Sequence, residues 1–342
     1  MRKLFVSVAV LALTAGAALA ADLPSRKAPP MLPPPPPPPM WTGFYAGLNA
    51  GYGFGTNNNT QSVAVGNLPF TGNTWGGSGT GPYGASSTLG AGLALSGVGQ
   101  TNQYGFIGGG QVGYNYQWGQ HFVIGIEADM QGTGIRGSSR TAGVGADSAI
   151  AGYNISNSNS YHVLNSSATG STGVNAGVDW LGTVRGRLGY LFTPTMLVYA
   201  TGGLTYGGVY ANVNNYAVAS SSLVDVDPSH SYTMNSFNHT FVGGGDQSSV
   251  LVGWNIGGGL EWMFMPNWSL KAEAIYWNMG NMTLPTVAFA AAPEGCGSYC
   301  GPSGSPASAI GATRVNYQGV IARAGVNYHF NWFAPAPVVA KY

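Results

Sequence analysis

Four segments of the chain share a seven-residue pattern in which apolar and polar positions alternate. They are residues 110–116, 186–192, 258–264 and 324–330. In each segment the third residue is Val or Leu, the fifth is Tyr or Trp and the seventh is Tyr or Phe, whereas the second and fourth are polar, charged or Gly. Alternation with period 2 predicts a strand with one apolar and one polar face. An aromatic pair at the strand end is typical of a strand that leaves the hydrocarbon at an aromatic girdle.

Short turns and further alternating segments extend this pattern to eight strands. The turns are expected at 119–120, 193–195 and 265–267, each followed by a second alternating segment at 122–130, 196–206 and 268–276. An opening strand is expected at 44–54 and a closing one at 320–330. The remaining connections, roughly 55–104, 131–178, 207–249 and 280–313, are rich in Gly, Ser, Asn and Thr. The sequence therefore predicts an all-β fold, an eight-stranded antiparallel transmembrane β-barrel with short periplasmic turns and long extracellular loops.

Composition excludes the main alternatives. Charged residues make up 7% of the 342 residues, against about a quarter in an ordinary soluble domain. No apolar run of about 18 residues follows the N-terminus, which excludes a bundle of membrane-spanning helices. A soluble β-sandwich is disfavoured because its outward residues would be polar rather than Tyr, Trp, Leu and Val.

The N-terminus predicts export. Arg2 and Lys3 precede an apolar stretch, and Ala18-Leu19-Ala20 has the form of a cleavage site, so residues 1–20 are interpreted as a signal peptide and the mature chain begins at Ala21. Residues 21–40 are rich in proline and are interpreted as a periplasmic linker, with a recognition sequence for a proline-binding domain as the alternative. The barrel is expected at 41–333 and a C-terminal tail at 334–342.

Strand parity assigns the charged residues to the inside of the barrel. If the aromatic-ended face meets lipid, nine charges fall on the opposite face: Glu127, Asp129, Asp179, Arg185, Arg187, Glu261, Lys271, Glu273 and Arg323. A Lys or Arg that faced lipid at mid-depth would cost about 2–4 kcal/mol. We interpret the nine as a network of salt bridges that fills the narrow lumen. A gated polar path past Arg185, Arg187, Lys271 and Glu273 is the alternative, and a catalytic carboxylate pair is disfavoured.

Other motifs carry weaker signals. Cys296 and Cys300 are expected to form a disulfide in an oxidising, exported setting, because no further metal ligands lie near them. Residues 108–113 match G-x-G-x-x-G, but a strand pattern continues where a dinucleotide site would need a helix. Few basic residues remain after signal removal, which excludes a nucleic-acid partner of the basic-patch kind. No cofactor, metal site or catalytic site is predicted.

Seven stretches resemble the small alphaproteobacterial outer-membrane β-barrel proteins, the OmpA-type family often described as outer-membrane immunogenic or porin-family proteins. They are 41–53 (WTGFYAGLNAGYG), 106–115, 126–129, 179–190 (DWLGTVRGRLGY), 198–204, 266–273 and 326–330. The resemblance implies an abundant protein of the cell outer membrane, in contact with lipid and lipopolysaccharide, that supports the envelope and is a surface antigen. It also implies that a C-terminal aromatic signal, Tyr328 and Phe330, is read by the insertion machinery. Here twelve residues follow Phe330, so Tyr342 is the competing candidate. The loops are long for the family, which leaves room for strands that extend above the membrane.

The expected function is a structural, surface-exposed role in the envelope without enzymatic activity. One alternative is a porin for small polar solutes, which would require ten or more strands or an oligomer. Another is binding of haemin or a host surface by the loops, through aromatic residues such as Trp75 and Tyr83 together with the region from Asp225 to His239. The sequence makes no prediction of the oligomeric state.

Overall fold

The computed structural model describes residues 41–57, 59–67, 85–155, 158–225, 233–290 and 308–330. The strands are β1 (Gly43–Gly55), β2 (Asn59–Asn67), β3 (Gly97–Gln100), β4 (Tyr104–Trp118), β5 (Phe122–Ile155), β6 (Ser158–Thr193), β7 (Met196–Asp225), β8 (Thr233–Met265), β9 (Trp268–Ala290) and β10 (Ser308–Phe330). One helix, α2 (Ala85–Leu95), lies between β2 and β3 in the chain. The signal peptide, the proline-rich linker, the C-terminal tail, Cys296, Cys300 and Tyr342 lie outside the described residues, and the predictions for them stay predictions.

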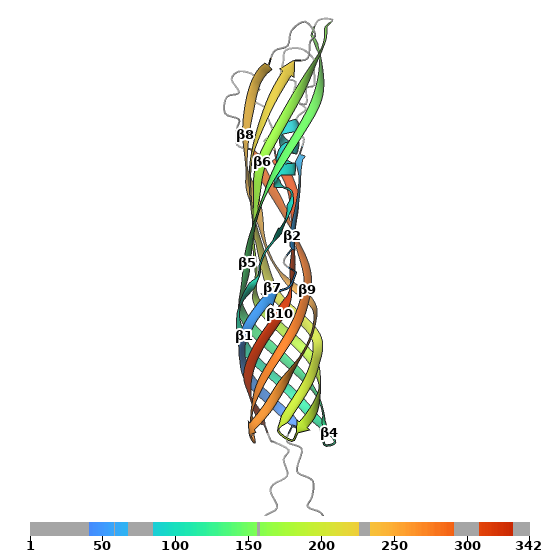
Figure 1. The fold of residues 1–342 in the computed structure, drawn as a ribbon, viewed down its shortest axis with the longest axis vertical. Coiled ribbons are helices and arrows are strands. Elements are labelled where there is room, and N and C mark those ends of the chain that lie inside the picture. The colour runs from blue at the N-terminus through green and yellow to red at the C-terminus, as the bar shows by residue number, and fades with distance from the viewer. Residues whose placement is uncertain are drawn as a thin grey trace, which may run out of the picture. The chain divides into compact units, whose positions relative to one another are not determined.

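The strands close into an antiparallel ring in the order β1-β4-β5-β6-β7-β8-β9-β10, with β10 paired back to β1 (Figure 1). β2 continues β1, because β10 pairs first with β1 as far as Gly55 and then with β2 from Thr60. In the same way, β3 pairs with β2 and β4 pairs with β1, so that β3 and β4 together form the next strand of the barrel. The ten strands thus form eight barrel strands, two of them interrupted, and the predicted eight-stranded barrel is confirmed.

Three tight turns join strands at the end of the barrel where the chain enters. β4 and β5, β6 and β7, and β8 and β9 are separated by two or three residues each. Gly119 in the first turn has φ 66°, a left-handed conformation that favours glycine. These are the turns predicted from the sequence, and they form the periplasmic end of the barrel.

The strands are far longer than predicted. β5, β6, β7 and β8 have 34, 36, 30 and 33 residues, whereas a membrane crossing needs about ten. Most of 131–178 and 207–249, predicted as loops, is therefore strand. Small inward residues such as Val174, Ala176 and Ala211 alternate there with outward Ser, Asn and Gly. The inward and outward residues differ little in hydrophobicity, so the sequence pattern does not reveal these strands.

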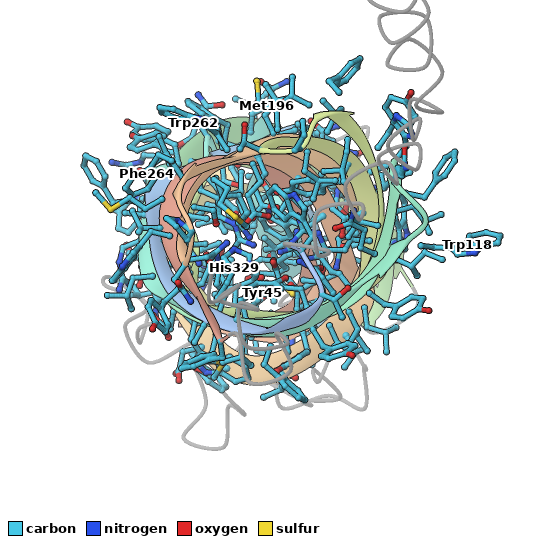
Figure 2. The ribbon with its side chains drawn as sticks, turned by 90° about the horizontal axis from the view of Figure 1, so that it is seen from below. Tyr45, Trp118, Met196, Trp262, Phe264 and His329 are labelled. Atoms are coloured by element: carbon cyan, nitrogen blue, oxygen red, sulfur yellow. The ribbon has the colours of Figure 1, made fainter. Side chains whose placement is uncertain are left out.

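Two groups of outward aromatic residues mark the membrane-facing part of the barrel. A lower girdle is formed by Phe44, Phe122, Tyr190, Phe192, Trp262, Phe264, Trp268 and Tyr328. An upper girdle is formed by Tyr52, Phe54, Tyr104, Phe106, Trp180, Tyr206, Trp254 and Tyr276. Phe44 and Phe54 are ten residues apart on β1, which corresponds to roughly 25 Å of height in a tilted strand. Figure 2 shows Trp118, Met196, Trp262 and Phe264 outside the ring, with Tyr45 and His329 inside it.

The part of the barrel beyond the upper girdle has its own core. An upper apolar cluster, which includes Ile135, Val178, Leu181, Trp277 and Tyr317, fills the lumen directly above the charged residues. Beyond it, α2 packs inside the sheet against β2, β5, β6, β7 and β10, and its Ala91, Ala94 and Leu95 belong to one apolar cluster with small residues of the sheet such as Ala64 and Ala168. Thr172 Oγ1 on β6 donates a hydrogen bond of 2.9 Å to the carbonyl of Leu95 at the end of the helix. Among the described residues, no helix has the length and apolar character needed to cross a membrane.

Candidate functional site: the charged lumen

Eight of the nine charged residues assigned to the lumen are buried inside the ring, and each is at most 6% exposed. They are Glu127 and Asp129 on β5, Arg185 and Arg187 on β6, Glu261 on β8, Lys271 and Glu273 on β9, and Arg323 on β10. We refer to these eight residues as the charge network. It contains four acids and four bases, so its formal charges cancel.

Strand register sets acids directly opposite bases. Glu127 pairs with Arg185 between β5 and β6, Glu261 with Lys271 between β8 and β9, and Glu273 with Arg323 between β9 and β10. Residues directly opposite on one face of antiparallel strands have their Cβ atoms about 5 Å apart. Two of these register pairs, Glu127–Arg185 and Glu273–Arg323, form ion pairs along the wall, whereas Glu261 and Lys271 form their ion pairs with other residues of the lumen.

Arg185 lies at the centre of the upper half of the network. Its guanidinium contacts Glu127, lies 3.0 Å from Asp129 Oδ2 and lies 3.1 Å from Glu273 Oε2. Arg323 binds two of the same carboxylates, with Nε 2.6 Å from Glu273 Oε1 and a terminal nitrogen 2.7 Å from Asp129 Oδ2. Lys271 Nζ bridges Glu127 and Glu273 at 2.9 and 3.1 Å. Each cation is thus shared, and strands on opposite sides of the barrel are joined through the lumen.

The lower half of the network is tied to tyrosines and a histidine. Arg187 lies 2.6 Å from Glu261 Oε2 and donates a hydrogen bond of 3.0 Å to the hydroxyl oxygen of Tyr45. Its guanidinium also stacks over the Tyr199 ring, with 4.0 Å from guanidinium carbon to ring centroid. Glu261 also lies 3.4 Å from His329 Nε2. The Tyr45 hydroxyl donates to Glu127 at 2.6 Å. These contacts link the two halves of the network.

The prediction for Asp179 is wrong. Its side chain is 53% exposed and pairs with Arg136 at 3.4 Å on the outside of the barrel. The β6–β7 register shifts between Val178 and Trp180, so even-numbered residues face inward above this bulge and odd-numbered residues face inward below it. Asp179 keeps the outward direction of the upper segment. A bulge inserts one residue and inverts parity, which a parity count over the whole strand does not detect.

Trp41 is a lumen residue that the sequence analysis missed. It directly follows the proline-rich segment, is 1% exposed and packs with Val123, Leu191, Leu197, Tyr199 and Met263 in a lower apolar cluster. Its Nε1–H donates a hydrogen bond of 2.9 Å to the carbonyl of Pro194 in a periplasmic turn. Its ring meets His329 edge-on, with centroids 5.7 Å apart. The available signal was a lone tryptophan next to the first strand, which has no periodic partner to mark it as inward.

The lumen of the described barrel is therefore layered. The lower apolar cluster lies at the periplasmic end, the charge network lies above it, and the upper apolar cluster and α2 follow. Every carboxylate of the charge network contacts at least one cation. Among the described residues, no group of three or more His, Cys, Asp or Glu side chains is arranged to hold a metal ion. The arrangement is suited to cross-linking the wall of the barrel.

Tyr328 and Phe330 lie at the end of β10 on the outer face, where Tyr328 belongs to the lower girdle and Phe330 packs beside it. Tyr328 is 37% exposed and contacts Trp268, with ring centroids 5.1 Å apart. The rings of Tyr328 and Phe330 are also 5.1 Å apart. Phe330 pairs with Phe44 where β10 closes the ring against β1.

Comparison with known proteins supports the resemblance seen in the sequence. No family model matches the chain. A "31 kDa outer-membrane immunogenic protein" of Brucella melitensis is 29% identical over 286 residues, which cover 83% of this chain and 90% of the relative. The protein of the same name from Brucella suis matches to the same extent. The chain is an outer-membrane β-barrel protein. Its periplasmic turns, lipid-facing girdles and long extension place part of it at the cell surface.

Three solved outer-membrane proteins are remotely similar to this chain. The attachment invasion locus protein Ail of Yersinia pestis has a TM-score of 0.24 at 10% identity, covering 82% of this chain and 99% of Ail. The outer membrane protein OprG of Pseudomonas aeruginosa has a TM-score of 0.30 at 10% identity, covering 84% and 96%. The outer membrane protease OmpT of Escherichia coli has a TM-score of 0.21 at 10% identity, covering 83% and 97%.

Proposed function

We propose that this outer-membrane protein is a closed barrel that strengthens the cell envelope and carries a rigid sheet surface outward, without conducting solutes and without enzymatic activity. The observation that carries the proposal is the filled lumen. Two apolar clusters flank a charge network in which every charge has a partner of opposite sign.

Electrostatics supports a structural role for the charge network. Burying charges is costly, and an unpaired one left by loss of its partner costs about 3–5 kcal/mol. Ions that moved through such a network would have to displace Arg185 or Lys271 from two carboxylates at once. The same contacts occupy the carboxylates that an enzyme would use as acid or base, which supports the absence of catalysis.

We propose partners that match the surfaces of the protein. The girdles fit the acyl chains and headgroups of outer-membrane lipid, including lipopolysaccharide.

Tyr328 and Phe330 are proposed as the signal read by the insertion machinery. The test compares the amount of heat-modifiable barrel in the outer membrane for Phe330→Ala with that for Tyr342→Ala. The proposal expects loss of assembly only for Phe330→Ala, and loss for Tyr342→Ala alone would overturn it.

A strain that lacks the gene tests the proposed function. Deletion is expected to raise sensitivity to detergent and to large antibiotics, while uptake of small polar solutes stays unchanged. Restoring the wild-type chain is expected to restore resistance. Reduced solute uptake with unchanged resistance to detergent would instead favour a porin.

A further inference from the structure

Apolar side chains form a continuous patch on the outer face of the barrel beyond the membrane. Tyr216, Val242 and Phe289 lie side by side on β7, β8 and β9. In the next row Val287, Ile310 and Val65 lie side by side on β9, β10 and β2, and Val63 extends the patch along β2. We call these seven residues the outer patch.

The outer patch is exposed and lies outside the hydrocarbon. Val65, Val242 and Phe289 are 59%, 57% and 54% exposed. Ile310 lies ten residues along β10 from Val320, which pairs with Phe54 of the upper girdle. That separation corresponds to roughly 25 Å of height, so acyl chains do not reach the patch. Soluble surfaces rarely leave a contiguous apolar patch uncovered, and such patches mark interaction sites.

Two opposite charges flank the outer patch. Asp246 is four residues from Val242 on the same face of β8, and Arg314 is four residues from Ile310 on the same face of β10. Both side chains are exposed, and β9 lies between their strands. Neither forms an ion pair with another described residue. The flanks of the patch thus carry one negative and one positive charge.

We infer that the outer patch docks against the outer patch of a second copy of this chain. Copies inserted by one machinery share one orientation, so a two-fold axis that relates them must run along the membrane normal. Rotation about this axis sets the β8 flank of one copy against the β10 flank of the other. Asp246 of each copy then faces Arg314 of its neighbour, twice per dimer. The patch is therefore complementary to itself in both apolar character and charge.

The first test measures the mass of the refolded mature protein in detergent and in lipid nanodiscs by sedimentation. The wild-type chain is expected to be dimeric, and the variant Phe289→Asn with Ile310→Asn is expected to be monomeric. Val144→Asn is the matched control, because Val144 is 80% exposed on β5 and lies outside the patch. A heat-shifted gel band shows that each variant has folded. A monomeric wild-type protein in both media, or a patch variant that stays dimeric, would overturn the inference.

The second test exchanges the flanking charges. Asp246→Arg and Arg314→Asp are each expected to raise the dissociation constant of the homodimer by about tenfold, because each sets like charges against one another twice. Mixing the two variants is expected to restore pairing as a heterodimer, since each interface then contains one acid and one base at both contacts. Attraction within one chain cannot produce this rescue. Homodimers of unchanged affinity, or no gain on mixing, would show that the charges do not meet across a two-fold axis.

Discussion

Arg185 contacts three carboxylates inside the barrel, Glu127, Asp129 and Glu273. Arg185→Met removes the cation and leaves these acids with fewer partners, so it is expected to lower the free energy of unfolding by about 3–5 kcal/mol. Unfolding in urea, followed by tryptophan fluorescence, measures the change. Arg136→Met is the control, because the exposed Arg136–Asp179 pair is worth about 0–1 kcal/mol. Equal losses for the two variants would contradict a stabilising charge network.

Trp41 closes the periplasmic end through both its ring and its Nε1–H. Trp41→Ala is expected to cost about 3–5 kcal/mol of unfolding free energy, because it leaves a cavity in the lower apolar cluster. Trp41→Phe retains most of the packing, loses the hydrogen bond to Pro194 and is expected to cost less. The same urea experiment measures both, and a loss for Trp41→Phe as large as for Trp41→Ala would assign the role to the hydrogen bond.

His239 on β8 lies beyond the membrane, and burial lowers its pKa below the ordinary value of 6.5. The unfolded chain therefore takes up a proton at a higher pH than the folded one. The stability associated with the neutral imidazole is present above about pH 6.5 and is lost as the pH falls through the lowered pKa. An NMR titration of the imidazole is expected to show the lowered pKa, and His239→Gln is expected to remove this part of the pH dependence. Titration at or above pH 6.5 would contradict the structure.

Single residues of the lumen were predictable where strand periodicity is regular. Glu127, Arg185 and Lys271 were placed inside because lipid excludes charges and side chains alternate with period 2. The same rule places Asp179 inside the barrel wrongly, because a bulge beside this residue inverts the parity of the strand. The partners of each charge were not predictable, since they depend on the register between strands and on contacts across the lumen.

At the level of elements, the backbone of α2 packs closely against glycines of the sheet. A Cβ at Gly145 of β5 would overlap the carbonyl oxygen of Gly90 in the helix. Gly145→Ala is therefore expected to displace α2 and to lower the protection of its amides in hydrogen exchange. Gly173→Ala on β6 is the control, because the nearest atom to its added Cβ is 3.8 Å away. Unchanged protection in Gly145→Ala would show that the helix is not held by this contact.

The turns and the membrane-spanning strands followed from the sequence, but their extensions did not. The segments that cross lipid alternate between large apolar and polar residues, which gives a strong signal. In residues 165–178 of β6, inward positions hold Ser and Thr as well as Ala and Val, and outward positions hold Asn, Ser, Thr and Gly, so the two faces differ little in hydrophobicity. Helix α2 was also missed, because its Ala, Gly and Ser residues lack both an apolar stripe and charged ends.

For the whole molecule, the proposed function requires a lumen that is closed in the folded state. Its layers come from all eight barrel strands, so no single loop or residue acts as the barrier. Closed barrels and porins share outer-membrane localisation, membrane-spanning strands and lipid-facing aromatic girdles. Only the filling of the lumen separates these two classes.

Single-channel recording of the refolded mature protein in a planar bilayer shows whether the lumen is closed. A heat-shifted gel band establishes folding, and a porin added at the end of each recording establishes that the bilayer reports pores. A closed lumen gives no steady conductance, and this is the result expected from the folded protein. A stable conductance that changes in Arg187→Ala or Lys271→Ala would show an open lumen lined by the charge network, and would contradict the proposal of a closed barrel.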